Sequence, residues 1–247
     1  MNSPRIAVVT GGLGGLGTAI CRRLAQQGLR VIAADLDARP EAIAAFDTAV
    51  AGLDVSHASL DVADDAACAA FVAGIQARHG RLDVLVNNAG ITRDVTLRKM
   101  TRVQWDAVID VNLGSVFNLC RPAVEGMVAR GYGRIVNLSS VNGQTGQFGQ
   151  TNYSAAKAGM HGFTMALARE VARKGVTVNT VSPGYCETAL VAAMPQAIRD
   201  GIVEQIPVGR LGQPDDIARA VAFLTAEDAG FITGATLPIN GGLFMSF

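Results

Sequence analysis

The chain has 247 residues, of which 49% are hydrophobic, and its 21 Lys and Arg balance 21 Asp and Glu. Without an excess of charge there is no global field to attract nucleic acid or an anionic membrane, and we expect neither as a partner. Cys21, Cys68, Cys120 and Cys186 are widely scattered. They predict neither a disulfide framework nor a metal site, and a reducing cytoplasm fits. No apolar run has the length of a signal peptide core or a membrane span.

In chain order, short β-branched runs alternate with longer amphipathic stretches, a pattern typical of βαβ units on a parallel sheet. We predict strands at residues 6–10, 30–34, 58–60, 84–87, 134–138, 176–181 and 236–239. We predict helices at residues 18–27, 41–50, 64–78, 105–129, 153–173 and 215–224. No linker interrupts this order, so we expect one α/β domain over residues 1–247, a doubly wound, Rossmann-like parallel sheet with helices on both faces.

The first predicted strand leads directly into a glycine-rich turn, which a predicted helix follows. Glycines let the backbone turn tightly and approach a pyrophosphate, whose charge the N-terminus of the next helix stabilises. The residues expected to bind a dinucleotide in this turn are Gly11, Gly12, Gly14, Gly15, Leu16 and Gly17. An ordinary βα turn in a glycine-rich protein is the alternative.

Asp35 closes the second strand, about 20 residues after the glycine turn. A carboxylate at this point can accept hydrogen bonds from both ribose hydroxyls of NAD. The 2′-phosphate of NADP would instead bring a like charge against the carboxylate. We therefore expect NADH as the cofactor and NADPH as the weaker alternative, although Arg39 lies nearby in the sequence. Asp37 is the other candidate for the ribose contact.

Tyr153 and Lys157 are four residues apart at the start of a predicted helix, and so lie on one face of it. A free phenol has a pKa of about 10, and a neighbouring ammonium together with an oxidised nicotinamide would lower that pKa. Ser139 and Ser140 end the strand that precedes this helix, where a hydroxyl can face a carbonyl oxygen. Taken alone, a Tyr-x-x-x-Lys pair is more often a surface ion pair or packing pair.

Together these features resemble the short-chain dehydrogenase/reductase superfamily along the whole chain. The resemblance rests on Thr10-Gly11-x-x-x-Gly15-x-Gly17, Asn87-Asn88-Ala89-Gly90, Asn112, Ser140, Tyr153-x-x-x-Lys157 and Pro183-Gly184. It implies that Tyr153 is the general acid in reduction and that Ser140 polarises the substrate oxygen. It also implies that Lys157 lowers the pKa of the tyrosine and that Asn112 holds a water linking Lys157 to solvent.

The same resemblance implies further cofactor contacts and an assembly. The adenosine side would be lined by Asn87, Asn88, Ala89 and Gly90, and the adenine would lie beside Asp61 and Val62. The carboxamide would contact Thr188, and the cofactor would also pass along Pro183 and Gly184. Members of the superfamily are commonly tetramers, so the resemblance implies a homotetramer.

Residues 90–94, 98–101, 137–144, 146–153 and 177–185 resemble, more closely, the acetoacetyl-CoA reductases of polyhydroxybutyrate synthesis. This resemblance implies reduction of a short 3-oxoacyl-CoA, acetoacetyl-CoA above all, to the (R)-3-hydroxyacyl-CoA. The residues that would surround the substrate are Asp94, Ser140, Gln147, Phe148, Gln150 and Tyr185. The likeness fails from about residue 36 to residue 60. Those reductases usually take NADPH, so Asp35 departs from their pattern.

Besides a dehydrogenase of some other small secondary alcohol, two other functions remain open at this point. One is a 3-oxoacyl-[acyl-carrier-protein] reductase, for which Arg130, Arg173 and Lys174 offer positive charge to an acidic carrier protein. The other, more remote, is a protein that binds NAD(H) only to sense it, without catalysis. Such a sensor can lose its catalytic groups.

Overall fold

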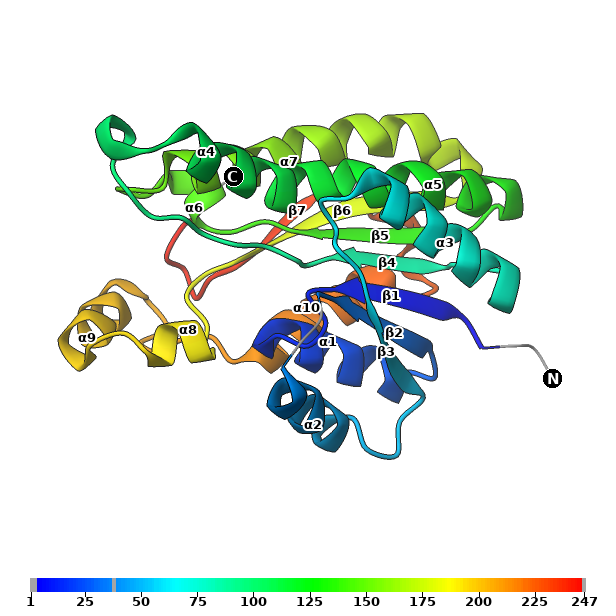
Figure 1. Ribbon diagram of the computed structural model, residues 1–247, viewed down its shortest axis with the longest axis horizontal. Helices are drawn as coiled ribbons and strands as arrows, with labels where there is room; N and C mark the ends of the chain where they lie inside the picture. The colour runs from blue at the N-terminus through cyan, green and yellow to red at the C-terminus, as the bar shows by residue number, and fades with distance from the viewer. Residues whose placement is uncertain (1–3, 37–38, 246–247) are drawn as a thin grey trace.

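The computed structural model describes residues 4–36 and 39–245, so Asp37 lies outside the described residues. Seven strands form one parallel sheet in the order β3-β2-β1-β4-β5-β6-β7 (Figure 1). They are β1 (Ile6–Thr10), β2 (Arg30–Asp35), β3 (Val55–Ser59), β4 (Val84–Asn87), β5 (Gly133–Leu138), β6 (Val176–Pro183) and β7 (Thr236–Ile239). β1 pairs with both β2 and β4, so the winding direction reverses beside β1, and a crevice opens at the carboxyl ends of these strands. The predicted doubly wound α/β fold is confirmed.

Helices cover both faces of the sheet (Figure 1). On one face lie α3 (Asp65–His79), α4 (Arg102–Ile109), α5 (Ser115–Arg130) and α7 (Thr151–Val171), and on the other lie α1 (Gly15–Gln26), α2 (Pro40–Ala49) and α10 (Pro214–Thr225). Three short helices, α6 (Asn142–Thr145), α8 (Ala189–Ala192) and α9 (Gln196–Gln205), lie toward the carboxyl ends of the strands. Single 3-10 turns occur at Leu97–Lys99, Ala172–Lys174 and Ala229–Phe231. Among the described residues, no helix combines the length and the apolar character that a membrane crossing needs.

The core consists of two apolar layers, one on each face of the sheet. Successive side chains of a strand point to opposite faces. Ile6 and Val8 of β1 accordingly belong to the layer under α3, α5 and α7, whereas Ala7 and Val9 belong to the layer under α1 and α10. Because both faces are covered, β1 is apolar throughout rather than alternating.

Several elements, the unpredicted α6 among them, differ from the sequence prediction. β3 spans Val55–Ser59 rather than residues 58–60, because it pairs only with β2 and its polar side chains face solvent at the sheet edge. The single helix predicted at residues 105–129 is divided by a π-helical turn at Asp110–Gly114. The segment between β6 and α10 holds α8 and α9, where we predicted no helix.

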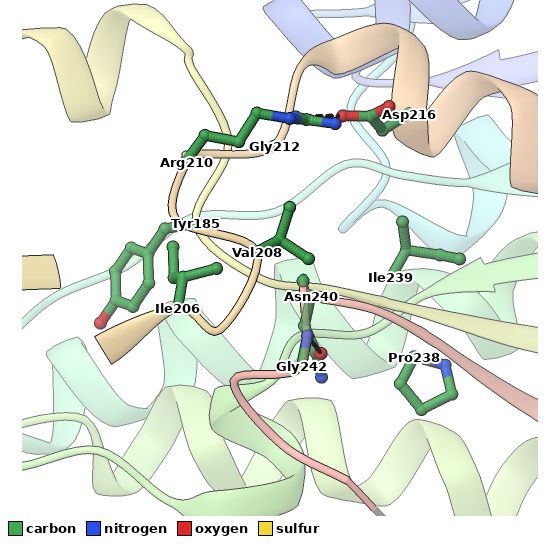
Figure 2. Close-up of a pocket in the computed structure, with 11 residues that line it drawn as sticks. Tyr185, Ile206, Val208, Arg210, Gly212, Asp216, Pro238, Ile239, Asn240 and Gly242 are labelled. Carbon is green, nitrogen blue, oxygen red and sulfur yellow. Dashed lines mark hydrogen bonds and ion pairs between the residues drawn. The ribbon is translucent and has the colours of Figure 1, made fainter. Parts of the chain in front are cut away.

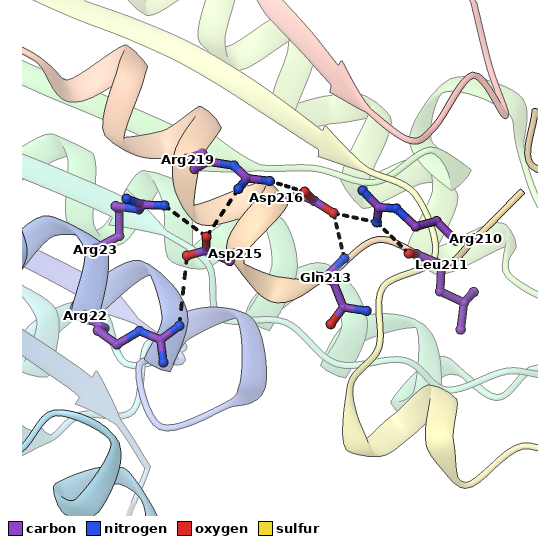
Figure 3. A network of polar contacts seen from close by, with 8 residues as sticks. All are labelled: Arg22, Arg23, Arg210, Leu211, Gln213, Asp215, Asp216 and Arg219. Carbon is purple, nitrogen blue, oxygen red and sulfur yellow. Dashed lines mark hydrogen bonds and ion pairs between the residues drawn. The ribbon is translucent and has the colours of Figure 1, made fainter. Parts of the chain in front are cut away.

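A network of arginines and aspartates connects α10 to α1 and to the segment that follows α9 (Figure 3). Asp215 pairs with Arg23 of α1 at 2.9 Å. Asp216 pairs with Arg210 at 2.8 Å and also accepts from the backbone N–H of Gln213 at 2.9 Å, which caps α10. The network therefore fixes the far end of the α8–α9 segment against the helix that follows the glycine turn.

Candidate active site

A groove of about 500 Å³ runs along the carboxyl ends of β1, β2 and β4. Most residues predicted to bind the cofactor line it, namely Gly11, Gly14, Gly15, Leu16, Gly17, Asp35, Asp61, Val62, Asn88, Ala89, Gly90 and Thr188. Gly12 does not line the groove. It lies against β2, where a Cβ atom would stand 2.6 Å from that of Ala33.

The glycine turn leaves room for a pyrophosphate. A Cβ atom at Gly17 would collide with the carbonyl oxygen of Gly11, so the helix can follow the turn this closely only with glycine there. Helix α1 begins at Gly15, and no side chain caps it at Gly14. Its first N–H groups therefore remain available to an anion. The residues present fit the phosphates of a dinucleotide.

Asp35 lies at the edge of the same groove, held by two backbone hydrogen bonds. Its Oδ2 accepts from the N–H of Leu13 at 3.0 Å and its Oδ1 from the N–H of Leu36 at 2.9 Å. Each carboxylate oxygen keeps a lone pair for a further donor, as two ribose hydroxyls would supply. Arg39 is not among the described residues that line the groove.

Asn87 and Asn88 play different parts, and the expectation that Asn87 faces the adenosine is wrong. The Asn87 amide is buried and donates to Asn137 of β5 at 2.8 Å. Asn88 lines the groove, and its amide donates to the carbonyl of Thr10 at 2.8 Å and to that of Gly11 at 3.0 Å. Asn88 thus ties the end of β4 to the glycine turn, while Asn87 joins two strands inside the sheet.

A second cavity adjoins the groove and contains the Tyr-Lys pair. Tyr153, Lys157 and Pro183 line it together with Leu16, Asn88 and Gly90, of which the last three also border the groove. The two cavities are therefore continuous at their shared residues. A dinucleotide lying in the groove would reach Tyr153 with its nicotinamide half.

The ammonium of Lys157 lies under the Tyr153 ring and donates to the carbonyl oxygen of Leu138 at 2.7 Å. Burial lowers the pKa of Lys157 to about 7. Burial also raises the pKa of Tyr153, and the charge of Asp94 raises this pKa further. A hydrogen bond with Ser140 acts in the opposite direction and lowers the pKa. The expectation that Lys157 depresses the tyrosine pKa is thus not met in the protein alone, because desolvation of both groups is the larger effect.

The two serines at the end of β5 have different surroundings. The buried Ser139 donates to the carbonyl of Lys157 at 2.8 Å and lies 2.8 Å from Nε2 of His161. Ser140 Oγ accepts from the backbone N–H of Asn142 at 3.1 Å, and its hydroxyl is directed toward Tyr153, to which it is hydrogen-bonded. This geometry agrees with the choice of Ser140 rather than Ser139 as the hydroxyl that meets the substrate.

Asn112 lies in the π-helical turn between α4 and α5. Its amide donates to the carbonyls of Ile91 and Val108, each at 2.9 Å, while its buried Oδ1 has no partner. A Cβ atom at Gly90 would stand 2.6 Å from that Oδ1 and 3.4 Å from Lys157 Nζ. The missing side chain of Gly90 therefore leaves a gap between the two polar atoms, which suits a bound water.

A larger cavity, of about 720 Å³, adjoins Tyr153 and has a polar and an apolar wall. All the predicted substrate residues line it: Asp94, Ser140, Gln147, Gln150 and Tyr185 form the polar wall, and the apolar Phe148, which is 86% exposed, lies next to Gln147 in the chain. Gly184, which we expected at the cofactor, lines this cavity instead. The apolar wall contains Val191, Met194, Ile198, Ile202 and Leu243.

A separate cavity of about 310 Å³ lies behind Tyr185 (Figure 2). Tyr185 borders both cavities, and in Figure 2 its ring lies beside Ile206 and away from Ile239. Arg210 and Asp216 also line the smaller cavity. Apart from Tyr185, no residue of the predicted site lines it, so we assign the chemistry to the larger cavity.

The sequence prediction missed the apolar wall and Asn142. The wall comes from α8, α9 and the C-terminal segment, which lie far from the recognised motifs along the chain. The apolar spacing of Ile198 and Ile202, at positions i and i+4, was the available signal for α9. Asn142 lines the cavity from α6, and a polar residue two positions after Ser140 was the signal for it.

Comparison with known proteins extends these observations. A family model described as Enoyl-(Acyl carrier protein) reductase matches residues 11–244. The chain is 55% identical to an acetoacetyl-CoA reductase of Allochromatium vinosum over 98% of this chain and 99% of the relative. It is 58% identical to an acetoacetyl-CoA reductase of Cupriavidus necator over 98% of each chain. It is also 43% identical to a 3-oxoacyl-[acyl-carrier-protein] reductase of Pseudomonas aeruginosa over 98% of each chain.

The matched residues include the glycine turn, the Tyr-Lys pair and both walls of the larger cavity. The identity to the curated relatives extends over nearly the whole length of each. The chain is therefore an oxidoreductase that acts on CH–OH groups with a nicotinamide cofactor, and it belongs to the short-chain dehydrogenase/reductase family.

Proposed function

We propose that this protein reduces acetoacetyl-CoA, and other short 3-oxoacyl-CoA thioesters, to the (R)-3-hydroxyacyl-CoA with NADH. The observation that carries the proposal is the position of Tyr153, which borders both the cavity continuous with the cofactor groove and the larger cavity. A carbonyl in the larger cavity would thus meet the phenol and the cofactor at one point. The relatives named acetoacetyl-CoA reductase support the choice of substrate.

In this reaction Tyr153 gives its proton to the carbonyl oxygen as that oxygen becomes a hydroxyl. The hydroxyl of Ser140, which faces Tyr153, would donate its proton to the same oxygen and stabilise the charge that develops on it. The bound NADH supplies the hydride that reduces the carbonyl carbon. Burial keeps the proton on Tyr153 in the free protein, which is the state a general acid needs.

Replacement of the proton on Tyr153 follows a short path into the protein. Lys157 lies beneath the phenol, and the gap left by Gly90 separates its ammonium from the unpartnered Oδ1 of Asn112. We place a water in this gap, between Lys157 and Asn112. Lys157, with a pKa of about 7, can then pass a proton toward Tyr153 and recover one from the water near neutral pH.

Asp35 supports NADH over NADPH. Two backbone hydrogen bonds hold its carboxylate at the edge of the groove. A 2′-phosphate brought to this carboxylate would be repelled, whereas ribose hydroxyls can donate to it. If NADPH were the cofactor, Arg39 would have to reach the groove, but Arg39 is not among the residues that line the groove.

The polar wall of the larger cavity suits a thioester arm. Gln147, Gln150 and Tyr185 offer donors and acceptors to the thioester and amide groups, and Phe148 can close over the reacting carbon once substrate is bound. We also propose that residues 1–247 act as one domain and that the enzyme is a cytoplasmic homotetramer serving polyhydroxybutyrate synthesis. The four free, buried cysteines agree with a reducing compartment.

A 3-oxoacyl-[acyl-carrier-protein] reductase is the second candidate, supported by the Pseudomonas aeruginosa relative. Its three predicted docking cations, Arg130, Arg173 and Lys174, are all exposed. Arg130 also donates to the carbonyl of Leu82 at 2.5 Å, and Arg173 and Lys174 lie at the end of α7. A sensor without catalysis is disfavoured because Asn112, Ser140, Tyr153 and Lys157 are all present.

The test is a spectrophotometric assay of the purified protein with acetoacetyl-CoA and acetoacetyl-carrier protein, each with NADH and with NADPH. Chiral analysis of the product completes it. We expect the highest kcat/KM with acetoacetyl-CoA and NADH, and the (R) product. A higher kcat/KM with the carrier protein would favour the second candidate, and no oxidation of either cofactor would favour the sensor.

A further inference from the structure

The polar contacts of the larger cavity converge on Asn142. This residue begins α6, a few residues after the end of β5, and lines the cavity together with Ser140. Its side chain and its backbone contact three groups that the proposed function uses: Ser140, Gln150 and Tyr185. These come from the end of β5, the start of α7 and the segment after β6.

The hydrogen bonds through Asn142 have a fixed direction. The carboxylate of Asp94 can only accept, so the bond of 2.8 Å between Asp94 and Gln150 requires Nε2 of Gln150 as donor. Oε1 of Gln150 then faces Asn142 and accepts from its Nδ2 at 2.9 Å. The orientation of the Gln150 amide is therefore set from both ends, by an acceptor at Asp94 and a donor at Asn142.

Asn142 has two further contacts. Its side chain hydrogen-bonds Tyr185, which lowers the pKa of that phenol, although burial and the charge of Asp94 raise it more. Its backbone N–H donates to Ser140 Oγ at 3.1 Å. The side chain thus bridges two predicted substrate residues, while the backbone alone orients the hydroxyl next to Tyr153.

We propose that Asn142 is a positioning residue, whose amide holds Gln150 in the orientation that receives the acyl-thioester arm. This inference rests on the proposed function, because it assigns a partner to a residue that would contact that arm. The division between side chain and backbone leads to a specific expectation. Loss of the side chain should weaken substrate binding and leave the hydroxyl of Ser140 in place.

The first test uses Asn142→Ala and the isosteric Asn142→Asp. An aspartate at this position cannot donate to Oε1 of Gln150, whereas its backbone N–H still reaches Ser140. We expect KM for acetoacetyl-CoA to rise about tenfold in both variants, as expected for a lost hydrogen bond, while kcat changes less than about threefold. The Kd for NADH and the Tm should stay near the wild-type values. Gln144→Ala on the same helix, which does not line the cavity, is the matched control.

The second test reverses the hydrogen-bond chain. In the double variant Asp94→Asn with Asn142→Asp, a Gln150 amide turned end over end regains both bonds, with the donors and acceptors exchanged. The KM of the double variant for acetoacetyl-CoA should then be lower than the value obtained by multiplying the KM increases of the two single variants. If Asn142 only stabilised the fold, the effects of the two substitutions on KM would be independent of each other.

The outcomes separate this inference from the function on which it rests. If the wild-type protein does not oxidise NADH with acetoacetyl-CoA, the proposed function fails. If the wild-type protein is active but both Asn142 variants keep KM within about twofold, or the two substitutions of the cycle are additive, only the positioning role is overturned.

Discussion

Lys157 Nζ lies 5.7 Å from the centre of the Tyr153 ring, one helical turn along α7. At this distance an ammonium is attracted to the face of the aromatic ring as well as to its hydroxyl. Both groups are nevertheless poorly hydrated, so each is driven toward its neutral form: the pKa of the phenol rises and that of the amine falls to about 7. The pair therefore holds the proton on Tyr153 until substrate and cofactor arrive.

Tyr153→Phe should remove the general acid while keeping the packing of the ring. We expect kcat for acetoacetyl-CoA reduction to fall by about 10² to 10⁴, the usual contribution of a positioned acid. The Kd for NADH, measured by fluorescence titration, should change less than about twofold because the groove is untouched. Tyr132→Phe, which alters a tyrosine outside the three site cavities, is the control and should keep the wild-type kcat. Wild-type activity in the Tyr153→Phe variant would contradict the role of Tyr153 as the general acid.

Asp35→Asn should weaken the preference for NADH. The wild-type protein should favour NADH over NADPH by about a hundredfold in kcat/KM, as expected from several kcal/mol of charge repulsion. The neutral amide should reduce this ratio by about tenfold or more, chiefly by improving NADPH. Asp54→Asn, at an exposed ion pair with Arg30, should leave the ratio unchanged. A wild-type preference for NADPH would contradict the role given to Asp35.

Lys157→Met should abolish activity and stabilise the fold. Lys157 is 3% exposed, and burying its charge costs free energy that an apolar side chain of similar shape does not. The folded pKa of about 7 lies below the unfolded value of about 10.4, so the unfolded chain binds the extra proton between these pH values. The wild-type penalty is therefore complete below pH 7 and disappears as the pH rises toward about 10.

We accordingly expect the variant to exceed the wild type by about 1 to 3 kcal/mol at pH 7, and by less at pH 9. Denaturant unfolding monitored by circular dichroism measures the difference. Lys174→Met, at an exposed position, should change the free energy of unfolding little at either pH. A destabilised Lys157→Met variant would show that the ammonium stabilises the fold more than its burial costs.

Asp216→Asn should loosen the end of the α8–α9 segment. The hydrogen bond from Arg210, followed by the one from the backbone of Gln213, holds the pKa of Asp216 below its usual range. Loss of this cap and ion pair should cost about 1 kcal/mol of stability at neutral pH. The wild-type advantage should be lost as the pH falls through the lowered pKa. Thermal unfolding at several pH values tests this, with the exposed Asp106→Asn as control.

The central residues of this candidate site could be proposed from the sequence because its motifs are local. Tyr153 and Lys157 lie one turn apart on any helix, and Gly17 must be glycine wherever a helix follows such a turn. The apolar run of β1 likewise predicts a strand covered on both faces. Edge strand β3 was placed imperfectly because its side chains are mostly exposed and carry no apolar pattern.

Only the tertiary structure decided what depends on residues far apart in the chain. The contacts of Asn142 with Gln150 and Tyr185, and the apolar wall from α9, arise where the carboxyl ends of separate strands meet. The opposed pKa shifts of Tyr153 and Lys157 have the same origin. Periodicity and spacing determine which face a side chain takes, whereas desolvation depends on everything that packs around it, and no single segment contains that information.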